Sequence, residues 1–450
     1  MTVATIENKI NNRTAKIGII GLGYVGLPLA LELAAKDFVV YGFDINSKKI
    51  NDLIAGYSYL ENNYSPEINS LVDKGNFLPT NEFDLLKYSD IVIICVPTPL
   101  DEKRAPDTSY ISSAVSSIKK FFHNDMLIIL ESTTFPGTTE MLLQNEFASL
   151  GYQVGKDYYL CYSPERIDPG NSIYKIRNTP VILGGATENC SFLGELFYKT
   201  FVNEVNLVSS PKIAEMSKLI ENTFRNINIA FVNELALMSE KMGIDIWEAL
   251  EASNTKPFGF MKFDPGPGIG GHCIPIDPIY LSWQAKNLGF DAKLINLAQE
   301  INNDMPFYVF NKIKQILNSK VEKPIVDSKV LLLGIAYKAN TSDIRESPSI
   351  KIYEMLKKCG VRVDYQDSFV QEFIDYQNNR VQSINLDYSK FQDYDCVVHL
   401  VNHSTYTKSS ILENSKYILD TKNFFDEYKG SNISKLGCKF NDLTLQNILA

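Results

Sequence analysis

A glycine-rich turn near the N-terminus restricts the fold of this chain more than any other feature. Residues 15–20 are mostly apolar, and residues 21–26 follow directly with the pattern Gly-X-Gly-X-X-Gly. Residues 27–36 have the composition of a helix, and residues 38–44 that of a second strand, which ends in an acid. A strand, a tight turn, a helix and a second strand in this order predict a βαβ unit, and with it a parallel sheet.

Each glycine of this turn has a separate physical purpose. Gly21 permits the tight turn, Gly23 lets the backbone approach a pyrophosphate, and Gly26 allows the helix to pack closely on the strand. The helix N-terminus then presents its positive end to the phosphates. Asp44 can accept hydrogen bonds from both ribose hydroxyls, and its charge would repel a 2′-phosphate. The pattern predicts a Rossmann-type domain that binds NAD rather than NADP, with a domain that holds no cofactor as the alternative.

Further strands are predicted along the N-terminal third, each followed by polar or turn-forming residues. Their near-continuous apolar character is typical of parallel strands covered on both faces. We expect them at residues 91–96, 127–130, 158–161 and 181–183. Because ligands of open α/β sheets bind at the carboxyl ends of the strands, the polar residues there are predicted to line one crevice. Ser132 and Thr134 are interpreted as capping or turn residues.

The middle of the chain has a different character. Residues 212–242 contain no proline or glycine and predict one long helix. Lys218 and Asn222 are four residues apart and share a face of it, although taken alone they read as two solvated polar residues. Further helices are expected at residues 245–253 and 278–286.

A loop between these helices contains the candidate nucleophile. Residues 264–278 place four glycines and four prolines around Cys273. Such a loop can hold a sulfur atom rigidly beside a bound molecule, whereas an inert core cysteine more often lies in an apolar strand or helix. An incidental cysteine in an irregular turn is the alternative. His272 is not expected to pair with this thiol, because adjacent side chains alternate faces in extended backbone.

The C-terminal part begins a second α/β pattern after a linker at residues 318–328. Strands are expected at residues 329–334, 361–366 and 395–401, and a helix at residues 349–359. The first of these strands is not followed by Gly-X-Gly-X-X-Gly, so no second full dinucleotide is expected. Lys338 and Arg345 lie just past it and suit a phosphate-bearing ligand, with a surface salt-bridge cluster as the alternative.

Composition excludes several classes of protein. The net charge of −9 argues against non-specific nucleic-acid binding. No run of about 18 apolar residues exists that could span a membrane, and the N-terminus lacks an apolar signal region. The seven cysteines are scattered without a CxxC pair, which argues against a disulfide framework or a metal site and favours a reducing, cytoplasmic location.

Taken together, these motifs resemble the UDP-glucose/GDP-mannose dehydrogenase family over residues 16–425. Residues 163–170 and the loop around Cys273 look like the branch that acts on UDP-N-acetylhexosamines. The resemblance implies an α/β architecture in three parts and a homodimer that pairs through the long helix. The parts are an NAD-binding Rossmann-type domain at residues 1–208, a central helical dimerisation and catalytic-loop domain at 209–317, and a Rossmann-like UDP-sugar-binding domain at 318–450.

The resemblance also implies the chemistry, a four-electron oxidation of a sugar C6 hydroxyl to a carboxylate with reduction of two NAD. Cys273 would form a thiohemiacetal and then a thioester. Lys218 and Asn222 would stabilise oxyanions, while Asp277, Glu165 and Thr133 would serve water and thioester hydrolysis. The implied cofactor residues are Gly21, Gly23, Tyr24, Val25, Gly26, Asp44, Lys49, Thr98, Thr133 and Arg345. The implied residues for the UDP-sugar are Glu165, Arg166, Lys218, Asn222, Gly271 and Lys338.

The substrate is the most open point of this interpretation. UDP-glucose or GDP-mannose is the alternative substrate, and a non-catalytic NAD-binding scaffold is the alternative class. The UDP-glucose branch has lysine where this chain has Ile276, which argues against UDP-glucose. Joint retention of Cys273, Lys218, Asn222 and Asp277 argues against the scaffold. The gluco, galacto and manno epimers are not distinguished, and the family implies synthesis of surface polysaccharide precursors.

Overall fold

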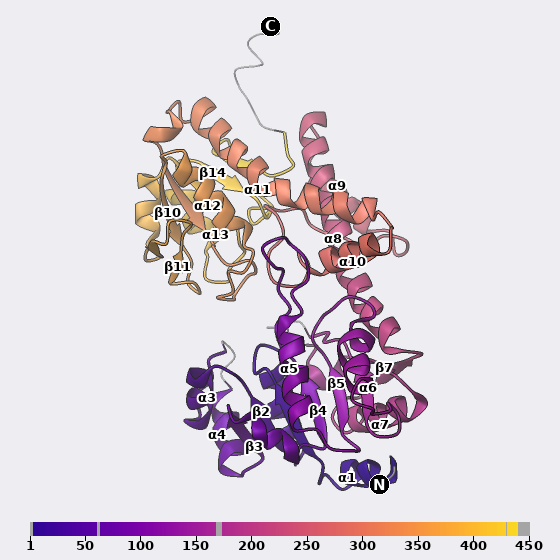
Figure 1. Ribbon diagram of the computed structural model, residues 1–450. Coiled ribbons are helices and arrows are strands. Elements are labelled where there is room, and N and C mark those ends of the chain that lie inside the picture. Colours follow the sequence, from indigo (N-terminus) through magenta and orange to yellow (C-terminus); the bar gives the residue numbers. More distant parts are fainter. Residues whose placement is uncertain (1–2, 61–63, 168–172, 429, 440–450) are drawn as a thin grey trace. The chain divides into compact units, whose positions relative to one another are not determined.

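The computed structural model describes residues 3–60, 64–167, 173–428 and 430–439 (Figure 1). The chain is mixed α/β and forms two compact units. Residues 1–221 and 279–291 form the first unit, and residues 222–278 and 292–450 form the second.

The first unit contains an eight-stranded sheet in the order β3-β2-β1-β4-β5-β6-β7-β8. Its strands are β1 Lys16–Ile20, β2 Val39–Phe43, β3 Phe77–Thr80, β4 Ile91–Ile94, β5 Leu127–Leu130, β6 Tyr159–Tyr162, β7 Val181–Gly185 and β8 Val205–Val208. The central pairs run parallel, as predicted from the apolar strands. The prediction is wrong for β7, which runs antiparallel to β6. The described residues between them contain only the short 3-10 helix η3 Ile176–Asn178, and no crossover α-helix returns the chain.

Helices cover both faces of this sheet, which explains why its central strands are apolar throughout. Ile17 and Ile19 of β1 point to one hydrophobic cluster with the helices at Gly26–Ala34 and Glu188–Tyr198, while Ile20 points to a second cluster with the helix at Ser109–Lys120. The helices are α1 Val3–Asn11, α2 Gly26–Ala34, α3 Ser47–Ile54, α4 Ser65–Asp73, α5 Ser109–Lys120, α6 Asn145–Ala148 and α7 Glu188–Tyr198, with the short turns η1 Phe83–Tyr88 and η2 Thr139–Gln144. Helix α1 was not predicted, and it joins the first cluster through Ile6 and Ile10, four residues apart.

Helix α8 Pro211–Met242 confirms the predicted long helix and has 32 residues. It is followed by α9 Ile246–Asn254, α10 Asp277–Asn287 and α11 Lys293–Ser319. Helix α11 was not predicted from the sequence, and it continues through Pro306 to the beginning of the expected linker. Its buried residues, among them Met305, Val309 and Ile313, lie three to four positions apart and pack into the core of the second unit.

The second unit contains a parallel five-stranded sheet in the order β10-β9-β13-β14-β15, as expected from a second α/β pattern. Its elements are β9 Lys329–Leu333, β10 Arg362–Gln366, β13 Cys396–His399, β14 Ile418–Asp420 and β15 Ile433–Lys435, with α12 Pro348–Lys358 and α13 Lys408–Asn414. A small hairpin joins β11 Glu372–Ile374 to β12 Arg380–Gln382, and two 3-10 turns are η4 Ile325–Asp327 and η5 Tyr388–Asp393.

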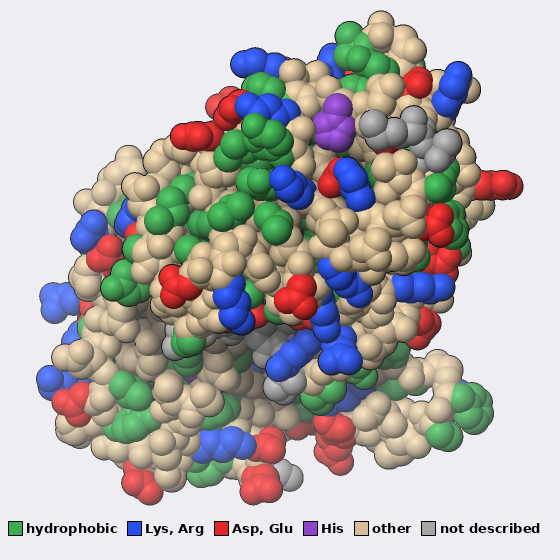
Figure 2. Space-filling model, turned by 90° about the horizontal axis from the view of Figure 1, so that it is seen from below, with side chains coloured by type: hydrophobic (Ala, Val, Ile, Leu, Met, Phe, Trp, Pro, Cys, Tyr) green, Lys and Arg blue, Asp and Glu red, His purple; other side chains and the backbone are tan. Residues whose placement is uncertain are grey.

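The surface carries both signs of charge. Both basic and acidic side chains are present on the described residues of the face in Figure 2. Among the described helices, none has the length and apolar character that crossing a membrane requires.

A buried carboxyl group fastens the first part of α8 to the loop that follows β5. Glu215 is fully buried, and its two oxygens accept hydrogen bonds from the Gly137 N–H at 2.5 Å, the Thr139 N–H at 2.8 Å and the Thr139 hydroxyl at 2.6 Å. Burial raises the pKa of Glu215 to about 7, against the opposing effect of these donors.

Replacing Glu215 with alanine should lower the apparent melting temperature of the protein, more at pH 5 than at pH 8. The loss leaves three donors without their acceptor, which costs about 3 kcal/mol and roughly 5–10 °C at pH 5. Because the pKa is raised in the folded state, the stabilisation by this carboxyl is fully present below pH 4.5 and is lost as the pH rises through about 7. Scanning fluorimetry at both pH values measures the difference, with exposed Glu204→Ala as the control. An equal loss at both pH values contradicts the assignment.

Candidate active site

The glycine turn after β1 has the geometry that a dinucleotide requires. Gly21 adopts φ +96°, and a Cβ added there would lie 2.6 Å from the Cys95 carbonyl oxygen. A Cβ on Gly26 would lie 1.9 Å from the Gly21 oxygen, so both positions exclude a side chain. A Cβ on Gly23 meets nothing within 4 Å, which leaves its backbone open to a ligand. The turn therefore fits the pyrophosphate of NAD.

Asp44 stands at the end of β2 in the position expected for a ribose acceptor. Its Oδ2 accepts a hydrogen bond from the Leu22 N–H at 3.1 Å, and its Oδ1 accepts one from the Asn46 N–H at 2.9 Å. The Lys49 ammonium lies 3.5 Å from Oδ2, which brings these two predicted cofactor residues together. The Tyr59 hydroxyl donates to the Leu22 carbonyl and so braces the same turn, a role for which the sequence offers no signal.

The other predicted cofactor residues of the first unit lie around the carboxyl edge of the sheet. Tyr24 is 43 % exposed, and Thr98 is buried with its carbonyl accepting a hydrogen bond from the Tyr280 hydroxyl. Thr133 is half-buried. Its neighbour Ser132 donates to the Val96 carbonyl at 2.8 Å, which agrees with the interpretation of Ser132 as a turn residue.

Thr134 has the local contact expected of a turn residue. Its hydroxyl is buried and donates to the Thr138 hydroxyl at 2.6 Å. This contact agrees with the structural interpretation of Thr134 made from the sequence.

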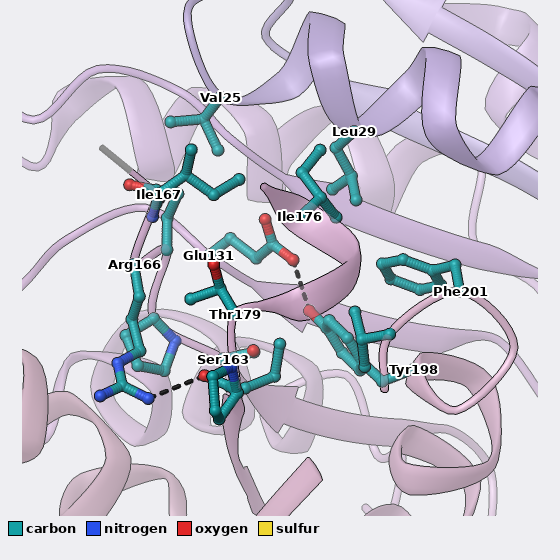
Figure 3. A pocket seen from close by; sticks show the side chains of 15 residues that line it. Val25, Leu29, Glu131, Ser163, Arg166, Ile167, Ile176, Thr179, Tyr198 and Phe201 are labelled. Atoms are coloured by element: carbon teal, nitrogen blue, oxygen red, sulfur yellow. Dashed lines mark hydrogen bonds between the residues drawn. The ribbon is translucent and has the colours of Figure 1, made fainter. Parts of the chain in front are cut away.

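A pocket lies at this edge, between α2 and the chain that follows β6 (Figure 3). Val25, which caps the N-terminus of α2, and Leu29 of α2 line it together with Glu131, which follows β5 directly. The Glu131 carboxyl accepts hydrogen bonds from the Tyr198 hydroxyl and, at 3.6 Å, from the Cys95 thiol. Burial, with a smaller contribution from the charge of Glu165, raises the pKa of Glu131 to about 7.

The sequence reasoning missed Glu131 and Tyr198. A carboxyl group directly after a buried strand is a signal that could have identified Glu131, whereas Tyr198 lies in an ordinary amphipathic helix.

The segment after β6 meets α8 within the first unit. The Lys218 ammonium donates to the Glu165 backbone carbonyl, and the Glu165 carboxylate accepts a hydrogen bond from the Ile167 N–H. Arg166 donates to the Pro180 carbonyl at 2.7 Å and forms an ion pair with Glu221 at 2.9 Å. The structure thus brings Glu165, Arg166 and Lys218 together, while residues 168–170 of the motif quoted above lie outside the described residues.

The cysteine loop belongs to the second unit. Cys273 is exposed, and its carbonyl accepts hydrogen bonds from the Ile276 N–H at 3.1 Å and the Asp277 N–H at 2.8 Å. Asp277 is buried and begins α10. The Asn222 amide donates to its carboxylate at 2.5 Å. Three of the predicted catalytic residues are therefore connected, and the other three, Lys218, Glu165 and Thr133, lie in the first unit.

The remaining predicted residues lie beside this loop in the second unit. The Gly271 N–H donates to the Arg345 carbonyl at 2.8 Å, and Gly271 adopts φ +85°. The Arg345 guanidinium is held by Asp343 at 2.5 Å, and Lys338 is half-buried. Burial, and then the charge of Arg345, lower the pKa of His272. Among the described residues, no group of His, Cys, Asp or Glu side chains could hold a metal ion.

Comparison with known proteins identifies three domains of one family along the chain. Residues 15–202 match the NAD binding domain of the UDP-glucose/GDP-mannose dehydrogenase family. Residues 212–304 match its central domain, and residues 331–427 match its UDP binding domain.

Individual relatives cover almost the whole chain. The UDP-N-acetyl-D-mannosamine dehydrogenase of Methanocaldococcus jannaschii is 35 % identical over 94 % of this chain and 96 % of its own length. The UDP-N-acetyl-D-glucosamine 6-dehydrogenase of Pseudomonas aeruginosa is 35 % identical over 79 % of this chain and 83 % of its own. The solved structure of a UDP-D-ManNAc dehydrogenase from Pyrococcus horikoshii, 32 % identical, superposes with a TM-score of 0.85 over 94 % of this chain and 99 % of its own. With a dinucleotide turn, a cysteine loop and three matching domains, the chain belongs to the UDP-glucose/GDP-mannose dehydrogenase family and is an NAD-dependent oxidoreductase of nucleotide sugars.

Proposed function

We propose that the protein oxidises the C6 hydroxyl of a UDP-N-acetylhexosamine to the uronic acid in two steps through a covalent intermediate on Cys273. The observation that carries the proposal is the exposed thiol of Cys273 in a glycine-rich loop whose end, Asp277, is bonded to Asn222. A thiolate suits this chemistry because it is a strong nucleophile and an acceptable leaving group. The similarity to dehydrogenases named for N-acetylated UDP-sugars supports the choice of substrate.

The first oxidation converts the C6 alcohol into an aldehyde. The hydroxyl proton passes to water as the C6–H bond breaks and hydride leaves, and the Lys218 ammonium stabilises the negative charge that develops on the oxygen. Asn222, one helical turn further along α8, donates a hydrogen bond to the oxygen as it gains negative charge. Both side chains are more than nine-tenths buried, which strengthens such interactions.

The second oxidation takes place on the enzyme. The Cys273 sulfur bonds to the aldehyde carbon and the carbonyl oxygen becomes an alkoxide that Lys218 and Asn222 stabilise. A second hydride leaves the same carbon and yields the thioester. Water, oriented by Asp277 with Glu165 and Thr133, then attacks the thioester carbon and releases the carboxylate and the free thiol. Altogether one alcohol, one water and two NAD give one carboxylate, two NADH and three protons.

The cofactor and the substrate are assigned to different parts of the chain. NAD, when bound, supplies the acceptor for each hydride. We assign its phosphates and ribose to Gly21, Gly23, Tyr24, Val25, Gly26, Asp44, Lys49, Thr98, Thr133 and Arg345. We assign the UDP-sugar to Glu165, Arg166, Lys218, Asn222, Gly271 and Lys338.

We further propose that the protein is a homodimer that pairs through α8. Phe224, Phe231, Met238 and Met242 follow one another at spacings of seven or four residues, so they form one stripe along the helix. Each is between 46 % and 62 % exposed in the single chain. A stripe of four large apolar side chains is costly to leave in water, and a second copy would cover it.

We also propose that the reaction takes place in the cytoplasm and supplies acidic sugars for surface polysaccharides. All seven cysteines are free in the structure, which is typical of proteins from a reducing compartment.

Replacing Cys273 with serine should stop the reaction at the aldehyde stage. Steady-state NADH formation should fall by at least about 10³-fold, because a hydroxyl is a far weaker nucleophile at neutral pH, while substrate affinity is retained. NADH yield is measured by absorbance, with about two NADH per sugar expected for the unmodified protein. Cys359→Ser is the matched control, because Cys359 caps the C-terminus of α12 and is not part of the loop that contains Cys273. Near-normal turnover of the Cys273→Ser variant would refute the covalent mechanism.

A panel of nucleotide sugars should rank the N-acetylated UDP-sugars first. A pocket built for an acetamido group leaves polar groups unpaired when UDP-glucose binds, at about 1–3 kcal/mol each. We therefore expect kcat/KM for UDP-GlcNAc, UDP-GalNAc or UDP-ManNAc to exceed that for UDP-glucose and GDP-mannose by at least about tenfold. Equal or better turnover of UDP-glucose would reassign the substrate and leave the mechanism intact.

Charged substitutions in the α8 stripe should separate the dimer. The double variant Phe224→Glu, Phe231→Glu places two carboxylates in the proposed interface, where burying them is costly. Light scattering at micromolar concentration should give twice the mass of one chain for the unmodified protein and a single-chain mass for the variant. Ile374→Glu, on the exposed hairpin strand β11, should remain dimeric. A single-chain mass for the unmodified protein would contradict the proposal.

A further inference from the structure

Four amide side chains connect α8 to α11 inside the second unit. Asn226 and Asn233 of α8 are fully buried, and Asn302 of α11 is 4 % exposed. The Asn233 amide donates to the Asn302 side-chain oxygen at 3.0 Å, and the Asn302 amide donates to the Asn226 backbone carbonyl at 3.0 Å. The Asn226 amide donates to the Gln299 side-chain oxygen at 2.8 Å, which completes a continuous network.

The same network holds the cysteine loop at both of its ends. At the beginning of the loop, the Gly266 N–H donates to the Asn233 side-chain oxygen at 2.9 Å. Directly after Cys273, the Asn226 amide donates to the Ile274 carbonyl at 3.1 Å, and the Gln299 amide donates to the Pro275 carbonyl at 2.7 Å. The two peptide groups that follow the nucleophile are therefore fixed by side chains from two different helices.

Helix packing alone does not account for these residues. An amide buried between helices has to recover the hydration that it loses, and an apolar pair of similar volume stabilises a helix contact at no such cost. Here three of the four amides bond to the backbone of a loop rich in glycine, whose conformation would otherwise be weakly determined, and Asn302 holds the other amides in place. The carbonyl of Cys273 itself accepts hydrogen bonds from the Ile276 and Asp277 N–H groups, so three successive carbonyl groups, beginning with that of Cys273, are held.

We propose that Gln299 and Asn226 are positioning residues for Cys273, and that Asn233 and Asn302 brace them. This inference rests on the proposed covalent role of Cys273 and adds residues to which neither the sequence motifs nor the domain matches assign a part. Gln299 acts through the Pro275 carbonyl. Its loss allows the loop to shift, and a displacement of about 1 Å at a nucleophile can cost up to 10²-fold in rate.

The test uses Gln299→Met, which keeps the volume of the side chain and removes both hydrogen bonds. Asn303→Leu, at an exposed position of the same helix, is the control. The first measurement is the rate of alkylation by iodoacetamide at Cys273 relative to that at Cys359, followed by peptide mass spectrometry in one sample. The others are kcat and KM for the UDP-sugar and the apparent melting temperature.

We expect the Cys273-to-Cys359 alkylation ratio to change by at least about threefold in Gln299→Met, and kcat to fall by about tenfold or more, with KM within about threefold. The control should match the unmodified protein. If Gln299→Met folds poorly, Gln299→Asn takes its place in the test. This variant keeps an amide but has a side chain shorter by one methylene group, and it should show the same two changes. An unchanged alkylation ratio in a folded variant overturns the proposal, whatever happens to kcat.

The unmodified protein separates this failure from that of the proposed function. If complete alkylation of Cys273 leaves NADH formation intact, Cys273 is not the nucleophile and the positioning role falls with it. If alkylation abolishes NADH formation but Gln299→Met leaves the ratio unaltered, the covalent mechanism stands and the positioning role alone is wrong.

Discussion

The hydrogen bond from Asn222 to Asp277 is the interaction on which the arrangement of the cysteine loop depends. It joins the middle of the longest helix to the first residue of α10, so the end of the loop cannot move without breaking a buried contact. Asp277 also supplies one of the N–H groups that hold the Cys273 carbonyl. Asp277 thus holds the proposed nucleophile, Cys273, through its backbone, and it carries the carboxylate that we propose orients water.

Polar groups in both units are buried where they connect elements that are distant in sequence. Glu215 fastens α8 to the loop after β5, and Glu131 is held by a tyrosine from α7. The amides of α8 and α11 do the same for the cysteine loop. Each such group costs desolvation, and in return it determines the position of a segment that apolar packing would leave free to slide.

Much of the fold could be predicted from local pattern, and the failures have identifiable causes. The glycine turn and Asp44 were recognisable because the spacing between them matches the distance from the pyrophosphate to the ribose of a dinucleotide. Helix α8 was recognisable because residues 212–242 lack proline and glycine. Helix α11 was missed because Pro306 reads as a helix breaker, although it is tolerated here inside a well-packed helix. The direction of β7 depends on a long connection rather than on its own residues. The amide network joins positions 226 and 299, which no local pattern relates.

The division of the chain into two units has a consequence for its synthesis. Neither unit is one continuous segment, because the chain passes from one to the other after residues 221, 278 and 291. During translation the first unit lacks its last segment until residue 291 has left the ribosome, by which time residues 222–278 of the second unit have already emerged. Neither unit can therefore be obtained by a single truncation. During synthesis, residues 222–278 stay exposed to aggregation until the rest of their core, including α11, has been made.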